Sequence, residues 1–136
     1  FVALRHVGGL RREICVLLTA ELIALSYYRV LAQAYEDPVL AAACERILLD
    51  ERGHVAFHRS TLSLEFAGMA PAARTASVLA WRAFVAATVK VVALDHRAVL
   101  ALAGVSRREF EREVRGRARR LADAVKRGPV EEPAWI

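Results

Sequence analysis

The dipeptide Asp37-Pro38 separates two long segments whose apolar residues recur every three or four positions. Asp is favoured just before a helix and Pro at its first position, so this pair predicts a helix start. The periodicity on either side predicts one helix over about 10–35 and a second over about 38–66. A connection this short makes consecutive helices antiparallel neighbours. The pair therefore constrains the chain to begin as a helical hairpin.

Two glutamates lie on the apolar faces of this hairpin. Glu21 and Glu51 each have apolar residues on the turns before and after them. At about 1.5 Å per residue, Glu21 lies roughly 24 Å from the turn, Glu51 roughly 21 Å and His54 roughly 25 Å. Carboxylates are almost never buried without a partner or a metal, so the matched heights predict one inward-facing metal-binding cluster. Carboxylates with an imidazole suit iron or manganese, and the absence of nearby thiolates argues against structural zinc.

Several other polar residues could belong to this cluster. His58 lies one turn beyond His54 on the same face and could be a further ligand, a group that orients a ligand, or part of the polar lining. Tyr28 shares the face of Glu21, where we expect an aromatic core residue with a satisfied hydroxyl rather than a partner of a ligand. On the third helix one member of the pair Asp95-His96 could face inward, where we expect a structural buried polar contact rather than a metal ligand.

The remainder of the chain predicts two more helices. A third helix is expected over about 72–103, and its charged residues argue against a membrane span. Ser106 and Glu109 form a capping box that predicts the start of a fourth helix, which ends at Gly128. A short tail over 129–136 follows. With no sustained alternation and no hairpin turn signal, we expect an all-α, antiparallel bundle of about four helices.

Length and composition indicate one domain of 136 residues with an apolar fraction of 56%, above the usual range. Cys15 and Cys44 are expected roughly 20 Å apart in the hairpin, too far for a disulfide. They are expected to be buried thiols in a reducing compartment, which places the protein in the cytoplasm. The chain begins with Phe rather than Met, so we expect that it is truncated at its N-terminus.

The net charge of +5 comes mainly from arginine, and many arginines fall in the expected fourth helix. Glutamates and an aspartate are interleaved with them, so much of this charge can pair within the helix. A solvated face is therefore the favoured interpretation. We expect neither a nucleic-acid partner nor a membrane partner.

The segments 17–28 and 47–54 resemble the second helix pair of the ferritin-like superfamily, and are most similar to bacterial ferritin-like domain proteins. In that family a lone Glu precedes the pattern Asp-Glu-x-x-His, which matches 50–54 here. The resemblance implies that Glu21 is a metal ligand, Glu51 a bridging carboxylate and His54 a terminal nitrogen ligand. It further implies a di-iron centre, with manganese as an alternative, that reacts with dioxygen or peroxide in an oxidoreductase or iron-oxidising activity.

A complete site in that family needs two such ligand sets, and this chain has one. Either an N-terminal helix pair is missing from the chain, or two copies form a homodimer in which each gives half of the site. A third possibility is a degenerate metal site. In that case the protein is a non-catalytic helical interaction module whose basic face docks an acidic partner.

Overall fold

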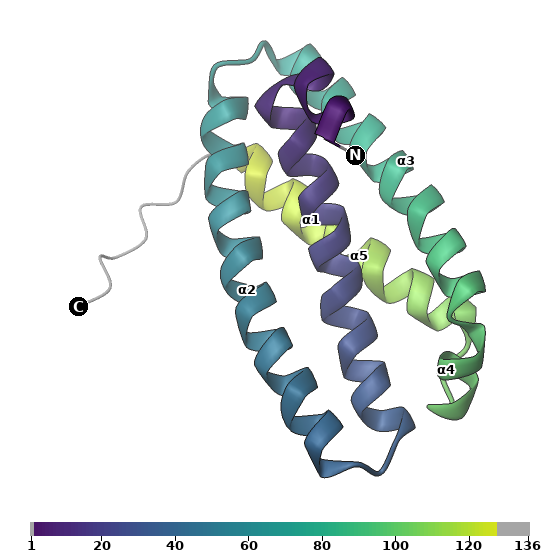
Figure 1. Cartoon of the computed structure of the whole chain (residues 1–136). Helices are drawn as coiled ribbons and strands as arrows, with labels where there is room; N and C mark the ends of the chain where they lie inside the picture. The colour runs from purple at the N-terminus through teal and green to yellow at the C-terminus, as the bar shows by residue number, and fades with distance from the viewer. Residues whose placement is uncertain (1, 128–136) are drawn as a thin grey trace.

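The computed structural model describes the backbone of residues 2–127 and the side chains of residues 9–127, and this part of the chain is all-helical (Figure 1). It contains no strand within the described residues. The all-α prediction is therefore confirmed. The expected tail over 129–136 and the stop at Gly128 lie outside the described residues. The helices are α1 (Val2–Ala34), α2 (Pro38–Ala67), α3 (Pro71–Asp95), α4 (Arg97–Leu102) and α5 (Arg107–Arg127).

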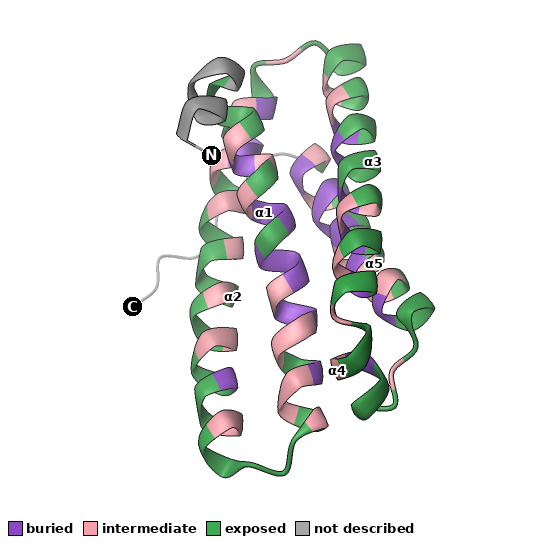
Figure 2. Cartoon of the chain, turned by 45° about the vertical axis from the view of Figure 1, so that its right-hand side comes forward, coloured by how far each residue is buried: buried purple, intermediate pink, exposed green. Residues whose placement is uncertain are grey.

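The turn between α1 and α2 is the one that Asp37-Pro38 predicts. The Asp37 carboxylate accepts hydrogen bonds from the backbone N–H groups of Val39, at 2.8 Å, and Leu40, at 3.2 Å. It thus satisfies two donors that a helix N-terminus leaves unpaired. From this turn α1 and α2 lie side by side along most of their length (Figures 1 and 2). Gly9 has φ 72° and ψ 163°, so regular helix resumes in α1 just after it, where the expected first helix begins.

The expected third helix over 72–103 is wrong as a single element. The chain bends at His96, which separates α3 from the short α4. Beyond the bend α4 contacts α1 and buries Leu100. The His96 ring packs against Tyr27 of α1, with ring centroids 4.5 Å apart. The bend thus places α4 against α1.

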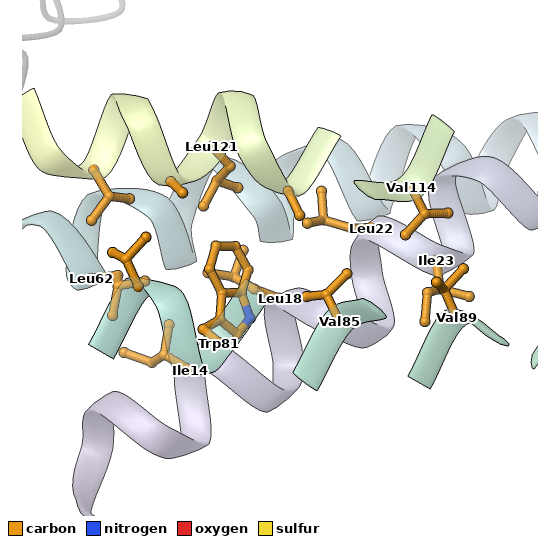
Figure 3. Close-up of a cluster of buried hydrophobic side chains, with 14 of the residues drawn as sticks. Ile14, Leu18, Leu22, Ile23, Leu62, Trp81, Val85, Val89, Val114 and Leu121 are labelled. Atoms are coloured by element: carbon orange, nitrogen blue, oxygen red, sulfur yellow. The ribbon is translucent and has the colours of Figure 1, made fainter. Parts of the chain in front are cut away.

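The hydrophobic core lies between α1, α3 and α5, with α2 closing one side (Figures 2 and 3). On α5 the apolar residues spaced three or four positions apart form one stripe, and each of its members is buried. Burying one such side chain stabilises the fold by about 1.5–3 kcal/mol relative to exposing it. Trp81 of α3 lies at the centre of Figure 3 among side chains from α1, α2 and α5. The stripe consists of Phe110, Val114, Ala118, Leu121 and Val125.

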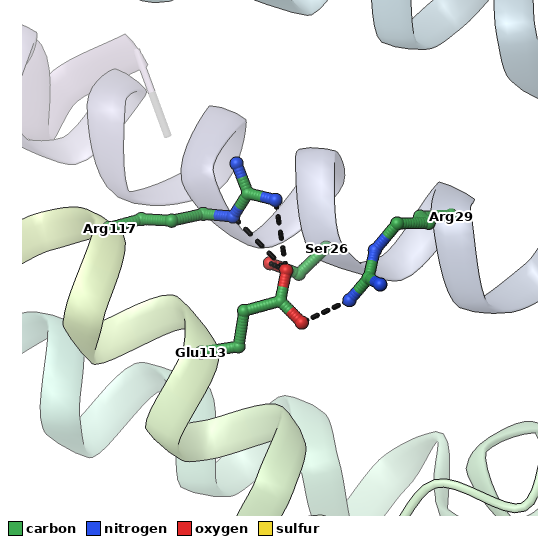
Figure 4. A network of polar contacts seen from close by, with 4 residues as sticks. All are labelled: Ser26, Arg29, Glu113 and Arg117. Carbon is green, nitrogen blue, oxygen red and sulfur yellow. Dashed lines mark hydrogen bonds and ion pairs between the residues drawn. The ribbon is translucent and has the colours of Figure 1, made fainter.

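A polar network joins α5 to α1 (Figure 4). Glu113 accepts hydrogen bonds from Ser26 at 3.2 Å and from Arg117 at 2.9 Å, and it forms an ion pair with Arg29. The capping box at the start of α5 is also confirmed, since Ser106 N–H donates to Glu109 at 2.8 Å. The other arginines of α5 lie mainly on its outer side. That helix carries nine Lys or Arg and four Asp or Glu residues, a net charge of +5.

Two described segments, Gly9–Ala34 and Pro71–Asp95, are long and apolar enough to cross a membrane by length and composition alone. The first is half buried inside the fold, and a core helix of a soluble protein meets the same criterion. The expectation of no membrane partner therefore stays a prediction. Both cysteines are free thiols, as expected, while the cytoplasmic location also stays a prediction.

Candidate metal centre

Glu21 occupies a buried position on the side of α1 that faces α2. Its neighbours one turn away, Leu18 and Leu25, are buried with it, and only 10% of the Glu21 side chain is exposed. The inward direction predicted for this carboxylate is therefore confirmed. A carboxylate in such surroundings is stable only if hydrogen bonds or a cation compensate for its lost hydration.

The three residues that the sequence predicts as metal ligands lie close together in the structure. One ligand atom from each of Glu21, Glu51 and His54 lies within 4.8 Å of the other two. The His54 Nδ1 atom is 3.5 Å from the Glu51 Oε2 atom, close enough for an ion pair but long for a hydrogen bond. The heights calculated from the Asp37 turn thus place all three residues correctly.

Exposure increases steeply across the cluster. The side chain of Glu51 is 22% exposed and that of His54 is 61% exposed, against 10% for Glu21. Both glutamates direct a buried oxygen into the cluster, as expected, but only the side chain of Glu21 is enclosed as a whole. The cluster is therefore closed at Glu21 and open to solvent at His54.

His58 is a fourth member of the cluster. Its Nδ1 atom lies 2.8 Å from the Glu21 Oε1 atom, and its side chain is 17% exposed. Of the roles considered from the sequence, this contact favours a group that orients Glu21, since His58 is absent from the set of ligand atoms that converge. The helical spacing from His54 was the only sequence signal for this role.

Two carboxylate oxygens in the cluster have no hydrogen-bond partner. Glu21 Oε2 and Glu51 Oε2 are both buried and accept no hydrogen bond within the described residues, and the nearest cationic group to Glu51 Oε2 is the His54 ring at 3.5 Å. Leaving a buried charged oxygen unpaired is expensive, so each such atom in a folded protein requires an explanation. A cation bound between these oxygens would satisfy both at once, and the carboxylate and imidazole donors present suit iron or manganese. The residues therefore fit a metal ion.

The other candidates from the sequence lie outside the cluster. Tyr28 is partly buried and contacts the ring of Tyr27, at 5.7 Å between centroids. The buried polar contact expected from one member of the pair Asp95-His96 is wrong, because the two residues lie where α3 ends and neither is buried. Their side chains are 80% and 40% exposed, and their charged atoms are 3.8 Å apart. At that position Asp95 faces solvent rather than the core.

Comparison of the chain with protein-family models, curated proteins and solved structures finds no match.

Proposed function

We propose that this chain supplies half of a di-metal carboxylate centre in a ferritin-like, antiparallel helical bundle. Glu21, Glu51 and His54 are the proposed ligands, and iron is the proposed metal, with manganese as the alternative. The observation that carries the proposal is the pair of buried oxygens on Glu21 and Glu51 that accept no hydrogen bond within the described residues. Two such oxygens beside an imidazole form a donor set that suits a cation, whose positive charge would compensate both carboxylates.

Each residue has a separate task in this proposal. His58 holds Glu21 Oε1 at 2.8 Å, which leaves Glu21 Oε2 to bind the metal. Glu51 is the candidate bridging carboxylate, and His54 gives a terminal nitrogen. The buried leucines beside Glu21 keep water from the closed side of the cluster. When bound, a pair of iron ions supplies electrons for the reduction of dioxygen or peroxide, which are the proposed co-substrates.

The open side of the cluster supports completion by another polypeptide segment. Three converging residues provide too few ligands for two metal ions, and His54 is largely exposed. A second copy of the chain, or helices that precede Phe1, would supply the other set and cover His54. A homodimer then binds two metal ions, which is one per chain.

Iron uptake tests the proposal directly. The protein is loaded anaerobically with ferrous iron, desalted and analysed for metal, in parallel with the variants Glu51→Gln and Asp50→Asn. Asp50 is a matched control, because it is the adjacent carboxylate on α2, is exposed and pairs with Arg46. Where a homodimer completes the site, we expect about one iron per chain in the wild type and in Asp50→Asn, and a loss of iron in Glu51→Gln. Equal retention by the two variants would contradict the assignment.

The oligomeric state, measured by sedimentation, distinguishes the two ways in which the metal site could be completed. If a homodimer completes it, iron shifts the wild type from monomer to dimer, and Glu51→Gln stays monomeric. If preceding helices complete it, this chain stays monomeric and binds iron only when those helices are added.

A non-catalytic interaction module is the second candidate function. Two observations favour it: His58 already satisfies one oxygen of Glu21, and α5 carries a net charge of +5 that an acidic partner could neutralise. In that case the wild type takes up no iron in any oligomeric state or in a longer chain. Substitution of Glu51 then affects stability alone.

A further inference from the structure

A groove of about 740 Å³ lies between the first turns of α1 after Gly9 and the N-terminal half of α3. Its volume is within the range of small-molecule sites, roughly 300–1,000 Å³. Trp81 and Phe66, both buried, contribute to its lining. None of the candidate metal ligands lines it. The groove is therefore a separate feature from the metal centre.

The polar residues of the groove gather at one end. Both α1 and α3 begin at the same end of the molecule (Figure 1), so residues early in each helix lie at one end of the groove. Arg12 and Ser77 lie near that end, and Val16, Ala80 and Phe84 lie further along. The groove thus changes along its length from polar to apolar, as a site for an amphipathic molecule would.

Within the part of the chain that the structure describes, one positive charge at the polar end has no ionic partner. Arg11 forms an ion pair with Glu65, with 3.4 Å between Arg11 Nε and Glu65 Oε2. Arg12 is exposed, and no hydrogen bond or ion pair joins it to another residue within 9–127. An arginine fork binds carboxylates and phosphates in a bidentate manner. The free charge at this end favours a ligand with an anionic head.

We propose that the groove binds a medium-chain carboxylate, with its head on Arg12 and its chain along Trp81 and Ala80 towards Phe84. The stretch of α3 that lines the groove, from Ala76 to Phe84, is about 12 Å long. This length accommodates an extended chain of about ten carbons. Each methylene that the groove covers should tighten binding about fourfold.

Calorimetric titration of the full chain with octanoate, decanoate and decanol tests this proposal. We expect saturable binding, with decanoate about tenfold or more tighter than octanoate and tighter than decanol of equal length. Arg12→Gln removes the positive charge at the polar end of the groove. This variant should weaken decanoate binding about tenfold and leave the affinity for decanol unchanged. The matched control is Arg82→Gln, because Arg82 is exposed on α3 and does not line the groove. Equal affinity for decanoate and decanol in the wild type would overturn the proposal.

A second pair of variants tests the position of the chain. Ala80→Trp fills the groove, whereas Ala83→Trp adds the same bulk to an exposed position of α3 outside it. We expect the first to abolish decanoate binding and the second to leave it intact. If Ala80→Trp instead changes the sedimentation of the protein and leaves decanoate affinity unchanged, the groove accepts a helix of another copy and the proposal fails. Iron uptake by these variants should match the wild type, so the outcome is independent of the metal assignment.

Discussion

Replacing Trp81 with Phe tests whether the indole links α3 to α1 by hydrogen bonding as well as by packing. Trp81 is 5% exposed, and its Nε1 donates to the Cys15 carbonyl oxygen at 2.9 Å and to Thr19 Oγ1 at 3.0 Å. Removing a buried Trp side chain down to Ala costs about 3–5 kcal/mol, and Phe retains most of that volume, so the packing loss is about 1 kcal/mol. The lost hydrogen bond adds about 1 kcal/mol. We expect Trp81→Phe to lower the free energy of unfolding by about 2 kcal/mol.

A double-mutant cycle with Thr19→Val isolates the hydrogen-bond contribution. Val preserves the shape of Thr19 and removes the hydroxyl that accepts from Trp81. Unfolding is followed by circular dichroism in urea, which does not depend on tryptophan emission. We expect the double variant to be destabilised by about 0.5–1 kcal/mol less than the sum of the single variants. Additivity to within about 0.3 kcal/mol would refute the hydrogen bond between Trp81 and Thr19.

Three further predictions concern the helix starts and the buried thiol. Asp37→Ala removes the cap of α2 and should lower the free energy of unfolding by about 1 kcal/mol in urea denaturation, whereas Asp37→Asn, which keeps a capping oxygen, should be close to wild type. Hydrogen bonds from Ser106 lower the pKa of Glu109, so its contribution to stability is present above its ordinary pKa and is lost as pH falls through the lowered one. The difference in melting temperature between wild type and Glu109→Gln should therefore vanish in acid, and a constant difference would contradict this. Burial raises the pKa of the Cys15 thiol to about 11. In a Cys44→Ala background, alkylation of Cys15 at pH 8 should therefore be far slower in the native protein than in urea.

Local signals predicted the helix boundaries well. Asp37-Pro38 and the Ser106/Glu109 box act within three residues, so their hydrogen bonds follow from the sequence alone. The convergence of Glu21 on Glu51 and His54 was predictable for a related reason. Helical rise is regular, and a short turn fixes the relative heights of two neighbouring helices.

Features that depend on distant packing were not predictable in the same way. The bend at His96 arises where α4 meets α1, and neither Gly nor Pro marks it in the sequence. The large exposure of His54 depends on what covers α2 from outside, which helical periodicity does not specify. The contacts of Glu113 with Arg29 and of His58 with Glu21 join residues far apart in the sequence. Each of these features depends on how the helices pack against one another, which the local sequence does not specify.

The arginines of α5 give the molecule a strong electrical asymmetry. That helix has a net charge of +5, which equals the net charge of the whole chain. The other residues therefore sum to neutrality, and the molecule has a large dipole with its positive end at α5. A protein with such a dipole rotates in an external field. Its α5 helix is therefore the part that first contacts an anionic surface or a cation-exchange resin. This orientation acts over about 8 Å at physiological ionic strength and weakens as salt is added.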